Sequence, residues 1–427
     1  MDLALVLFGS FFILIMLGVP IAVSLGVSSV VGLWWTGMSY SILAPTVYSA
    51  ISKYSLLAIP FFILAGFIME KAGISRRLIY CVETLLGGLR GGLALSAVVA
   101  AVFFAAISGS GPATVAALGA VLIPAMVAQG YDRGMAGGLL ASSGSIGIII
   151  PPSVAFIVFA SLAQVSVAEL FVAGVVPGLL VAAGFIACTY IVMGVKGNFI
   201  VGERHSYREK LVAFRDALWG ILTPVIILGG IYSGIFTPTE AAGVAVVYGL
   251  FVGVVVYREI SPRKLLDVLV DAAVSTASVM YIVALATVFA YLLTTTRVAQ
   301  DLAQSIVGIS SSAIVVLLVI NAVLLVAGFF LDTISAYFIF LPVILPIALE
   351  LGVDPIHLGV FVTVNLAIGQ FTPPVGVNLF VASNIGKIPA NEIMRSVVPY
   401  ILSAIISLLV ITFIPQLSTW LPSVLVD

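Results

Sequence analysis

The chain has 427 residues, of which 62% are hydrophobic and 8% are charged, and its formal net charge at pH 7 is −1. Soluble domains carry about 25% charged residues, so this composition excludes a water-soluble protein and indicates one that lies in a lipid bilayer. The near-zero net charge gives no basic surface for nucleic acid. Two cysteines and two histidines are too few for a disulfide framework or a transition-metal cluster.

Long runs without a charged residue locate the membrane-spanning segments, because a spanning helix needs about 20 apolar residues. Such runs include 3–52, 54–69, 91–131, 134–168, 302–331 and 355–386. Several are too long for one span and too short for two. Charged residues gather in the segments 71–90, 196–216 and 258–271.

The run 91–131 is flanked by a basic residue on each side, Arg90 and Arg133. Basic loops lie in the cytoplasm, so the chain must return to the side from which it entered. The middle of the run reads SGSGP at 108–112, which is a poor helix and a good turn. We therefore predict a re-entrant hairpin over about 91–131.

The next run crosses the membrane once but contains Pro151-Pro152. Two adjacent prolines remove two backbone donors and stop a helix, so we predict a broken helix over about 134–165. The polar segment 196–217 then follows as a cytoplasmic linker, and an extra span is expected at about 218–236.

The second half of the chain repeats the first at a shift of 222 residues. Under this shift Gly147 falls on Gly369 and Pro151-Pro152 falls on Pro373-Pro374. Internal repeats are typical of secondary transporters. The repeat predicts a second hairpin over about 305–350 and a second broken helix over about 355–386. The chain then divides into a first repeat at 1–195, the linker at 196–217, and the extra span with the second repeat at 218–427.

The distribution of basic residues gives the relative orientation of the two repeats. The segment 71–90 holds four basic residues, whereas the equivalent segment 293–312 holds only Arg297. Conversely, 387–395 holds Lys387 and Arg395, whereas 165–173 holds none. Because basic loops are cytoplasmic, equivalent segments face opposite sides, and the repeats are predicted to be inverted.

Irregular backbone at membrane depth is tolerated only where it is buried in protein or lines a cavity. Broken helices offer N–H groups that attract anions and carbonyls that coordinate cations, and nearby hydroxyl and amide oxygens suit hard cations. We expect the tips and breaks to meet near the midplane around Na⁺ and a carboxylate. The candidate Na⁺ ligands are Ser108, Ser110, Gly144, Ser145, Pro151, Gly328, Asp332, Thr333, Gly369, Thr372 and Pro373. The candidate substrate ligands are Ser110, Pro112, Ser153, Ser335, Pro374 and Asn378.

Two acidic residues have a structural interpretation beside a functional one. Asp332 lies at membrane depth, where acids are usually functional, but its place before Thr333 also suits a helix N-cap. Thr237 and Glu240 have the spacing of a capping box, which predicts a helix start.

Five segments resemble the large permease (M) subunit of tripartite ATP-independent periplasmic (TRAP) transporters. They are GSGPATVAALG at 109–119, GIIIPPSVAFIVFA at 147–160, SGIFTPTEAAGVAVVYGL at 233–250, GFFLDTISAYFIFLPVILPI at 328–347 and NLAIGQFTPPVGVNLFVAS at 365–383. The resemblance implies an all-α polytopic membrane protein with inverted repeats, two re-entrant hairpins and two broken helices. It also implies an elevator-type transporter similar to the ion-transporter superfamily.

The same resemblance implies a function and partners. The chain is expected to be the permease of a Na⁺-coupled importer of organic acids, which a periplasmic binding protein delivers. Na⁺ is the coupling ion, and no other metal or cofactor is expected. A small Q membrane subunit is expected as a separate chain. The expected location is the cytoplasmic (inner) membrane of a bacterium or archaeon, with a cytoplasmic N-terminus and a periplasmic C-terminus.

Two alternatives remain. A standalone Na⁺/carboxylate or anion symporter of related architecture would work without a binding protein. An intramembrane enzyme would need a motif such as HExxH, paired aspartates or a nucleophile–base pair at membrane depth, and the sequence contains none. We therefore expect a transporter and not an enzyme.

Overall fold

The computed structural model describes residues 3–195, 200–307 and 312–425, and these residues are almost entirely helical. The first half contains α1 (Leu3–Met16), α2 (Ile21–Thr36), η1 (Tyr40–Ile42), α3 (Leu43–Ile51), η2 (Tyr54–Leu57), α4 (Ala58–Lys71), α5 (Ile74–Leu86), α6 (Gly92–Ser108), α7 (Gly111–Ala128), α8 (Arg133–Gly144), α9 (Ile146–Ile149), α10 (Val154–Ala163) and α11 (Val167–Val195).

The second half begins with the long helices α12 and α14 and ends with a series of helices similar to that of the first half. It contains α12 (Tyr207–Tyr232), α13 (Pro238–Phe251), a π-helical turn η3 (Val252–Val256), α14 (Pro262–Thr295), α15 (Val298–Val307), α16 (Ala313–Gly328), α17 (Thr333–Glu350), α18 (Pro355–Gly369), α19 (Val377–Gly386), α20 (Ala390–Ser396), α21 (Val398–Phe413) and α22 (Gln416–Leu425). Within the described ranges the β-structure is limited to one isolated bridge, between Arg90 and Val201.

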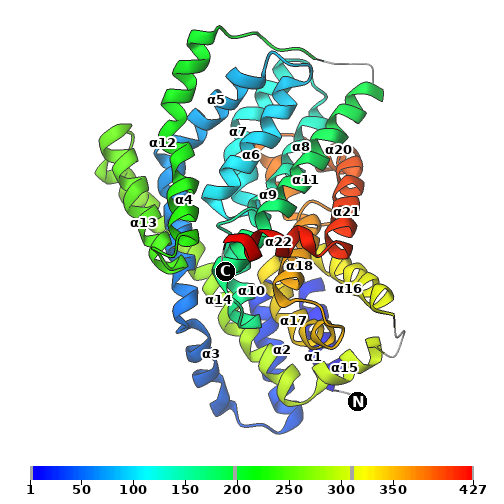
Figure 1. The fold of residues 1–427 in the computed structure, drawn as a ribbon. Helices are drawn as coiled ribbons and strands as arrows, with labels where there is room; N and C mark the ends of the chain where they lie inside the picture. Colours follow the sequence, from blue (N-terminus) through cyan, green and yellow to red (C-terminus); the bar gives the residue numbers. More distant parts are fainter. Residues whose placement is uncertain (1–2, 196–199, 308–311, 426–427) are drawn as a thin grey trace.

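Among the described residues, seven helices are long and apolar enough to cross a membrane, and up to nine if each of two bent helix pairs counts as one span. The predicted all-α, multi-pass membrane protein is thus confirmed. In the view of Figure 1, α4, α12 and α13 lie on the left, while α6 to α11 and α16 to α21 form the larger part on the right. The long helix α14 contacts α4 as well as α17 and so connects the two parts.

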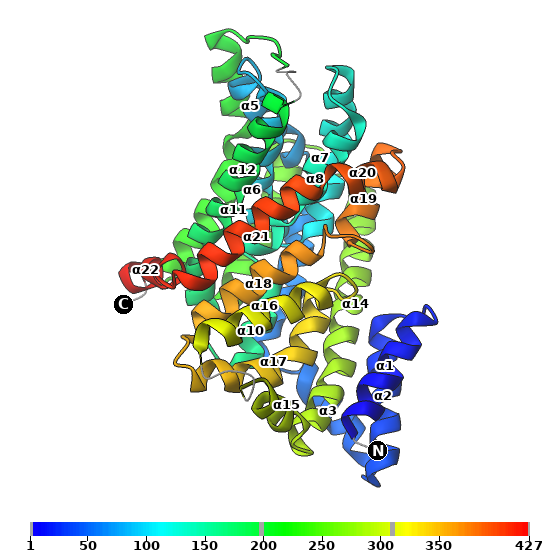
Figure 2. The same cartoon turned by 90° about the vertical axis from the view of Figure 1, so that its right-hand side faces the viewer.

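The two amphipathic helices α5 and α15 lie at opposite ends of the molecule, α5 at the top and α15 at the bottom of Figures 1 and 2. The N-terminal helix begins at Leu3 at the bottom in both views. The predictions that the N-terminus and the 71–90 segment are both cytoplasmic are therefore incompatible. The helices α1 to α4 lie between these two segments, which end up at opposite ends of the molecule.

The helix at the place of the expected extra span begins earlier than predicted. Helix α12 starts at Tyr207, inside the expected linker, and residues 196–199 of that linker lie outside the described residues. The reason is a capping box in which the Ser206 hydroxyl accepts a hydrogen bond from the Glu209 N–H, while the Glu209 carboxylate accepts one from the Ser206 N–H. The span therefore runs over Tyr207–Tyr232 instead of 218–236.

Two helical hairpins, each a pair of consecutive helices joined by a tight turn, lie in the larger part of the molecule. The first is α6–α7, which turns at Gly109 and Ser110, and Gly109 has a left-handed φ of 60°. The second is α16–α17, which turns over 329–332. Four residues of the predicted second hairpin, 308–311, lie outside the described residues. We call these turns tip 1 (108–113) and tip 2 (329–334).

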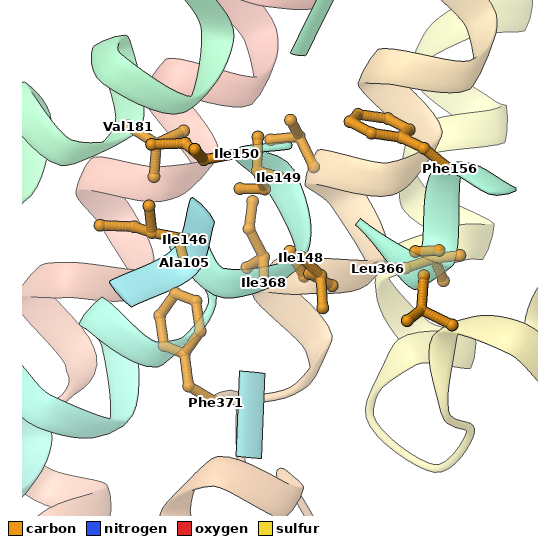
Figure 3. Packing of buried hydrophobic residues seen from close by; sticks show 14 of the residues in the cluster. Ala105, Ile146, Ile148, Ile149, Ile150, Phe156, Val181, Leu366, Ile368 and Phe371 are labelled. Carbon is orange, nitrogen blue, oxygen red and sulfur yellow. The ribbon is translucent and has the colours of Figure 1, made fainter. Parts of the chain in front are cut away.

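The chain leaves the helical conformation at both double prolines. After α9 it is irregular over 150–153 before α10 begins, and the helices on either side are bent by 42°. After α18 it is irregular over 370–376 before α19 begins. We call these segments break 1 and break 2. The apolar residues beside both breaks pack together, with Ile148 and Ile149 near Leu366 and Ile368 (Figure 3).

Candidate functional site

A cavity of about 230 Å³ lies where both tips and both broken helices face the helices α4 and α14. The larger part of the protein contributes Phe104, Ser108, Gly109, Ser110, Gly111, Pro112, Ala113, Ile148, Val154, Ala155, Asp332, Thr333, Ile334 and Gln370. The opposite wall consists of Ile63, Gly66, Phe67, Glu70, Ser275 and Val279. The cavity is therefore an interface between two groups of helices.

The opposite wall follows from helical periodicity. On α4 the lining residues Ile63, Gly66, Phe67 and Glu70 recur at the spacing of one helix face. At Gly66 this wall lies against the end of α6, because a Cβ built there would lie at an ordinary contact distance of 3.7 Å from the Ile107 carbonyl oxygen. This wall is mostly apolar, with Glu70 at one end.

Tip 1 is held by a local hydrogen-bond network. The Ser108 hydroxyl accepts a bond from the Ser110 N–H (3.2 Å) and lies 3.0 Å from the Thr114 hydroxyl. The Ser110 carbonyl accepts from the Thr114 hydroxyl at 2.8 Å and from the Ser108 hydroxyl at 3.0 Å. Ser110 makes no side-chain cap to α7. The N-terminus of α7 therefore faces the cavity without a side-chain partner.

In tip 2 the Asp332 side chain takes up the free N–H groups at the start of α17. One Asp332 carboxylate oxygen accepts from the N–H groups of Ile334 (3.0 Å) and Ser335 (3.2 Å), and the other accepts from the Ser335 hydroxyl. This is an N-cap, so the capping interpretation of Asp332 is confirmed. Asp332 and Thr333 line the cavity, whereas Ser335 lies behind them and is buried.

Gln370 connects the two tips from the end of α18. Its Nε2 donates to the Thr333 hydroxyl at 3.2 Å. Its Oε1 is buried without a hydrogen-bond partner among the described residues, and a Cβ built on Gly111 would fall against it. Buried acceptors are nearly always paired, so this oxygen is available to a ligand.

Asn378 supplies a second unpaired amide oxygen beside Gln370. Its Nδ2 donates to the Ala141 carbonyl at 3.2 Å, and its Oδ1 is buried without a partner in the described part of the chain. A Cβ built on Gly111 would lie 3.3 Å from both atoms. Asn378 is fully buried and lies behind tip 1 rather than at the cavity wall.

Break 1 is closed by Ser153. Its hydroxyl donates to the Ile148 carbonyl at 2.6 Å and accepts from the Phe156 N–H at 3.4 Å, which caps α10. A Cβ on Gly109 would lie 2.8 Å from the Pro152 carbonyl oxygen, so tip 1 packs directly on break 1. Pro151 is buried but does not line the cavity.

Break 2 is packed against tip 2 through glycine backbone. A Cβ on Gly369 would lie 2.5 Å from the carbonyl carbon and oxygen of Gly328, so only glycine fits. The Thr372 hydroxyl donates to the Ile368 carbonyl at 2.7 Å. Pro373 is half-buried and Pro374 is exposed. None of these residues lines the cavity.

The remaining candidates lie behind tip 1. The Ser145 hydroxyl donates to the Ser142 carbonyl at 2.6 Å. Gly144 approaches α7 so closely that a Cβ there would lie 3.1 Å from the Gly111 carbonyl oxygen. Both residues are buried and neither reaches the cavity.

The structure therefore divides the predicted ligands into two sets. Five of them line the cavity: Ser108, Ser110, Pro112, Asp332 and Thr333. Ten do not: Gly144, Ser145, Pro151, Ser153, Gly328, Ser335, Gly369, Thr372, Pro373 and Pro374. Asn378 lies behind the wall. Sequence reasoning missed Gln370, Glu70 and Ser275; the position of Gln370 just after a helix end and before two prolines was the one available signal.

The charge of the lining is acidic. None of the described residues that line the cavity is Lys or Arg, and two of them, Glu70 and Asp332, are acidic. The described residues contain no group of three or more His, Cys, Asp or Glu that could hold a metal ion. The oxygen atoms of Gln370, Asn378 and the tip carbonyls suit a hard monovalent cation, and the start of α7 suits an anionic group.

Comparisons with known proteins agree on one family. Residues 8–417 match the family model described as "Tripartite ATP-independent periplasmic transporter, DctM component". The chain is 45% identical over 381 residues to the C4-dicarboxylate TRAP transporter large permease protein of Pseudomonas aeruginosa, covering 89% of each chain. The chain is also 42% identical to the isethionate TRAP transporter permease protein DctMQ of Oleidesulfovibrio alaskensis. That match covers 96% of this chain and 65% of the relative's length.

A solved structure supports the fold. The YdaH transporter of Alcanivorax borkumensis matches with a TM-score of 0.67 at 15% identity, covering 87% of each chain. That likeness concerns the fold alone. Taken with the family model that covers nearly the whole chain, these matches show that the chain belongs to the DctM family, the large membrane permease component of tripartite ATP-independent periplasmic transporters.

Proposed function

We propose that this chain is the permease of a Na⁺-coupled importer that carries organic acids delivered by a periplasmic binding protein. One observation carries the proposal: both tips and the end of α18 meet in one cavity whose other wall is α4 and α14. A cavity between two groups of helices is what a carrier needs in order to expose one site to either side of the membrane.

The Na⁺ sites are proposed at the oxygen-rich backs of the two tips. Near tip 1 the oxygens belong to Ser108, Ser110, Gly144 and Ser145, and the unpaired amide oxygens of Gln370 and Asn378 support a cation there. Near tip 2 the proposed ligands are carbonyl and hydroxyl oxygens around Gly328, Gly369 and Thr372. Na⁺, like other hard cations, prefers such oxygen ligands.

The transport movement is proposed to be an elevator. The moving part comprises about 91–165 and 305–385, with α6–α7 and α16–α17 as re-entrant hairpins, and it slides along α4 and α14. The inverted repeat is supported by helix bounds: α7 and α17 coincide at a shift of 222 residues, and the starts of α8 and α18 do the same. It is also supported by the opposite placement of α5 and α15.

Two partners are proposed, a small Q membrane subunit and a periplasmic substrate-binding protein. The Q subunit is proposed as a separate chain, and a relative whose name joins M and Q supports its pairing with the permease. Organic acids are supported as substrates by relatives named for C4-dicarboxylates, 2,3-diketo-L-gulonate and sialic acid.

The proposed location is the inner membrane of a bacterium or archaeon, with the α5 end in the cytoplasm and therefore Leu3 on the periplasmic side. The periplasmic C-terminus stays a prediction.

Uptake by reconstituted vesicles tests this proposal. Vesicles that contain the chain with its Q subunit and binding protein should accumulate labelled organic acid under an inward Na⁺ gradient and not under an equal K⁺ gradient. Uptake that is indifferent to Na⁺ would remove the coupling. Uptake that is unchanged when the binding protein and Q are left out would favour the standalone Na⁺/carboxylate symporter instead.

A further inference from the structure

Three helices begin at the cavity wall, and two of their N-termini are already occupied. The Ser153 side chain caps α10, and the Asp332 carboxylate caps α17. Only α7, which begins at Gly111, has no side-chain cap. Free N–H groups at a helix start attract one anionic group. The start of α7 is therefore the one of these three helix starts that is open to a carboxylate, because Ser153 and Asp332 cap the other two.

An independent observation supports a ligand site at the start of α7. Gln370 is nine-tenths buried, its Oε1 has no partner among the described residues, and this atom is directed at Gly111. Leaving a buried acceptor unpaired is costly. A coupling cation bound beside the start of α7 would satisfy it and would stand next to a carboxylate at that helix start.

The wall opposite the start of α7 disfavours a second anionic group. It consists of Ile63, Gly66, Phe67 and Val279 together with the polar Ser275 and the acidic Glu70. The Glu70 carboxylate lies 3.9 Å from the Lys71 ammonium, and Asp271 is close enough to interact with it electrostatically. The side chains of Glu70, Lys71 and Asp271 together carry a net charge of −1. Glu70 lines the cavity and Lys71 does not, so the charge that faces the cavity is negative. A second carboxylate at this wall would meet repulsion and apolar surface.

We propose that the cavity selects organic acids that have a single carboxylate and an apolar body over dicarboxylates of the same size, with Glu70 as a specificity-determining residue. This inference rests on the proposed function, because it concerns the same cavity. It distinguishes the chain from relatives named for C4-dicarboxylates. The carboxylate lies at the start of α7, and the apolar body lies along α4 and α14.

Two isosteric acids test the proposal on the purified full-length chain. 4-Methylpentanoate and succinate share the carbon chain from the first carboxylate, and an isopropyl group in one replaces the second carboxylate of the other. Thermal stability is measured in NaCl while each acid is titrated. We expect 4-methylpentanoate to raise the melting temperature, with a half-saturating concentration about 10-fold or more below that of succinate.

Two variants that each remove one negative charge test whether Glu70 causes the preference for 4-methylpentanoate over succinate. Glu70→Gln keeps the shape of the side chain, and we expect it to narrow the 10-fold preference to about 3-fold or less by improving succinate. Glu350→Gln removes the same charge at the exposed far end of α17, about 25 Å along the helix from tip 2. We expect this control to leave the preference unchanged.

The outcomes separate this inference from the proposed function. Succinate that stabilises the protein as well as 4-methylpentanoate, or a preference that Glu70→Gln does not alter, would overturn the inference and leave an organic-acid carrier intact. Stabilisation by no organic acid of either class, at any Na⁺ concentration, would overturn the proposed function together with the inference.

Discussion

At the scale of single residues, Glu259 ties helix α5 to the loop between α13 and α14. Its carboxylate lies 2.6 Å from the Arg76 guanidinium and 2.7 Å from that of Arg77, which also stacks 3.8 Å over the Tyr257 ring. Glu259 is 22% exposed, whereas Arg76 is 68% exposed, so the Arg77 contact dominates. We expect Glu259→Gln to lower the free energy of unfolding by about 1–2 kcal/mol, because the charge-assisted hydrogen bond from Arg76 and the ion pair with Arg77 both weaken.

Thermal unfolding in detergent measures this effect, with Glu350→Gln as the control for loss of one surface charge. A melting temperature of Glu259→Gln equal to that of Glu350→Gln would show that the contact contributes nothing.

Gly369 allows the closest backbone approach at the site. We expect Gly369→Ala to destabilise the protein by about 1–3 kcal/mol and to abolish transport, because the added Cβ meets the Gly328 backbone, which cannot move aside. Gly243 in α13 is the matched control: nothing lies within 4 Å of a Cβ there, and alanine is favoured in a helix by about 0.5–1 kcal/mol. Thermal unfolding and vesicle uptake compare the two variants, and equal behaviour would refute the packing argument.

At the scale of helices and their caps, Ser153 and Thr237 perform the same task in different surroundings. Ser153 is fully buried, whereas Thr237 lies at an exposed start of α13 in the predicted capping box with Glu240, which the structure confirms. We expect Thr237→Ala to cost about 1 kcal/mol. Ser153→Ala should lower the free energy of unfolding by about 1–3 kcal/mol more than Thr237→Ala does, because the buried Ile148 carbonyl then loses its hydrogen-bond donor.

Unfolding measurements on both variants decide between a cap and a ligand for Ser153. A Ser153→Ala protein with unchanged stability but a raised substrate KM would assign Ser153 to substrate binding, as the sequence alone suggested.

The helices themselves could be predicted because prolines, glycines and caps leave local signals. Two adjacent prolines, as at Pro151-Pro152, block continuation of a helix, and Thr237 with Glu240 has the spacing of a capping box, which is typical of a helix start. The distinction between Ser108, which lines the cavity, and Ser153, which caps a helix, could not be predicted. Both are hydroxyls beside a break, and only packing decides whether the backbone or a ligand takes the hydrogen bond.

Cavity residues that come from helices far away in the chain could not be predicted from the sequence either. Glu70 ends an apolar helix next to Lys71 and looks like an interfacial residue; it lines the cavity because α4 packs beside tip 1. The start of α12 is different, since Ser206 and Glu209 have the spacing of a capping box within the polar linker and could have been identified.

At the scale of the whole molecule, the central claim is that the part carrying tip 1 moves against α4. A reducible bifunctional thiol reagent tests it in a background with Cys81 and Cys188 replaced by alanine. One bridge joins Gly66→Cys on α4 to Ala113→Cys at tip 1, both of which line the cavity. The control bridge joins Ile68→Cys to Gly249→Cys, which lie side by side on α4 and α13. We predict that the first bridge stops Na⁺-driven uptake until it is reduced, while the control does not; undiminished uptake with the first bridge in place would contradict the account.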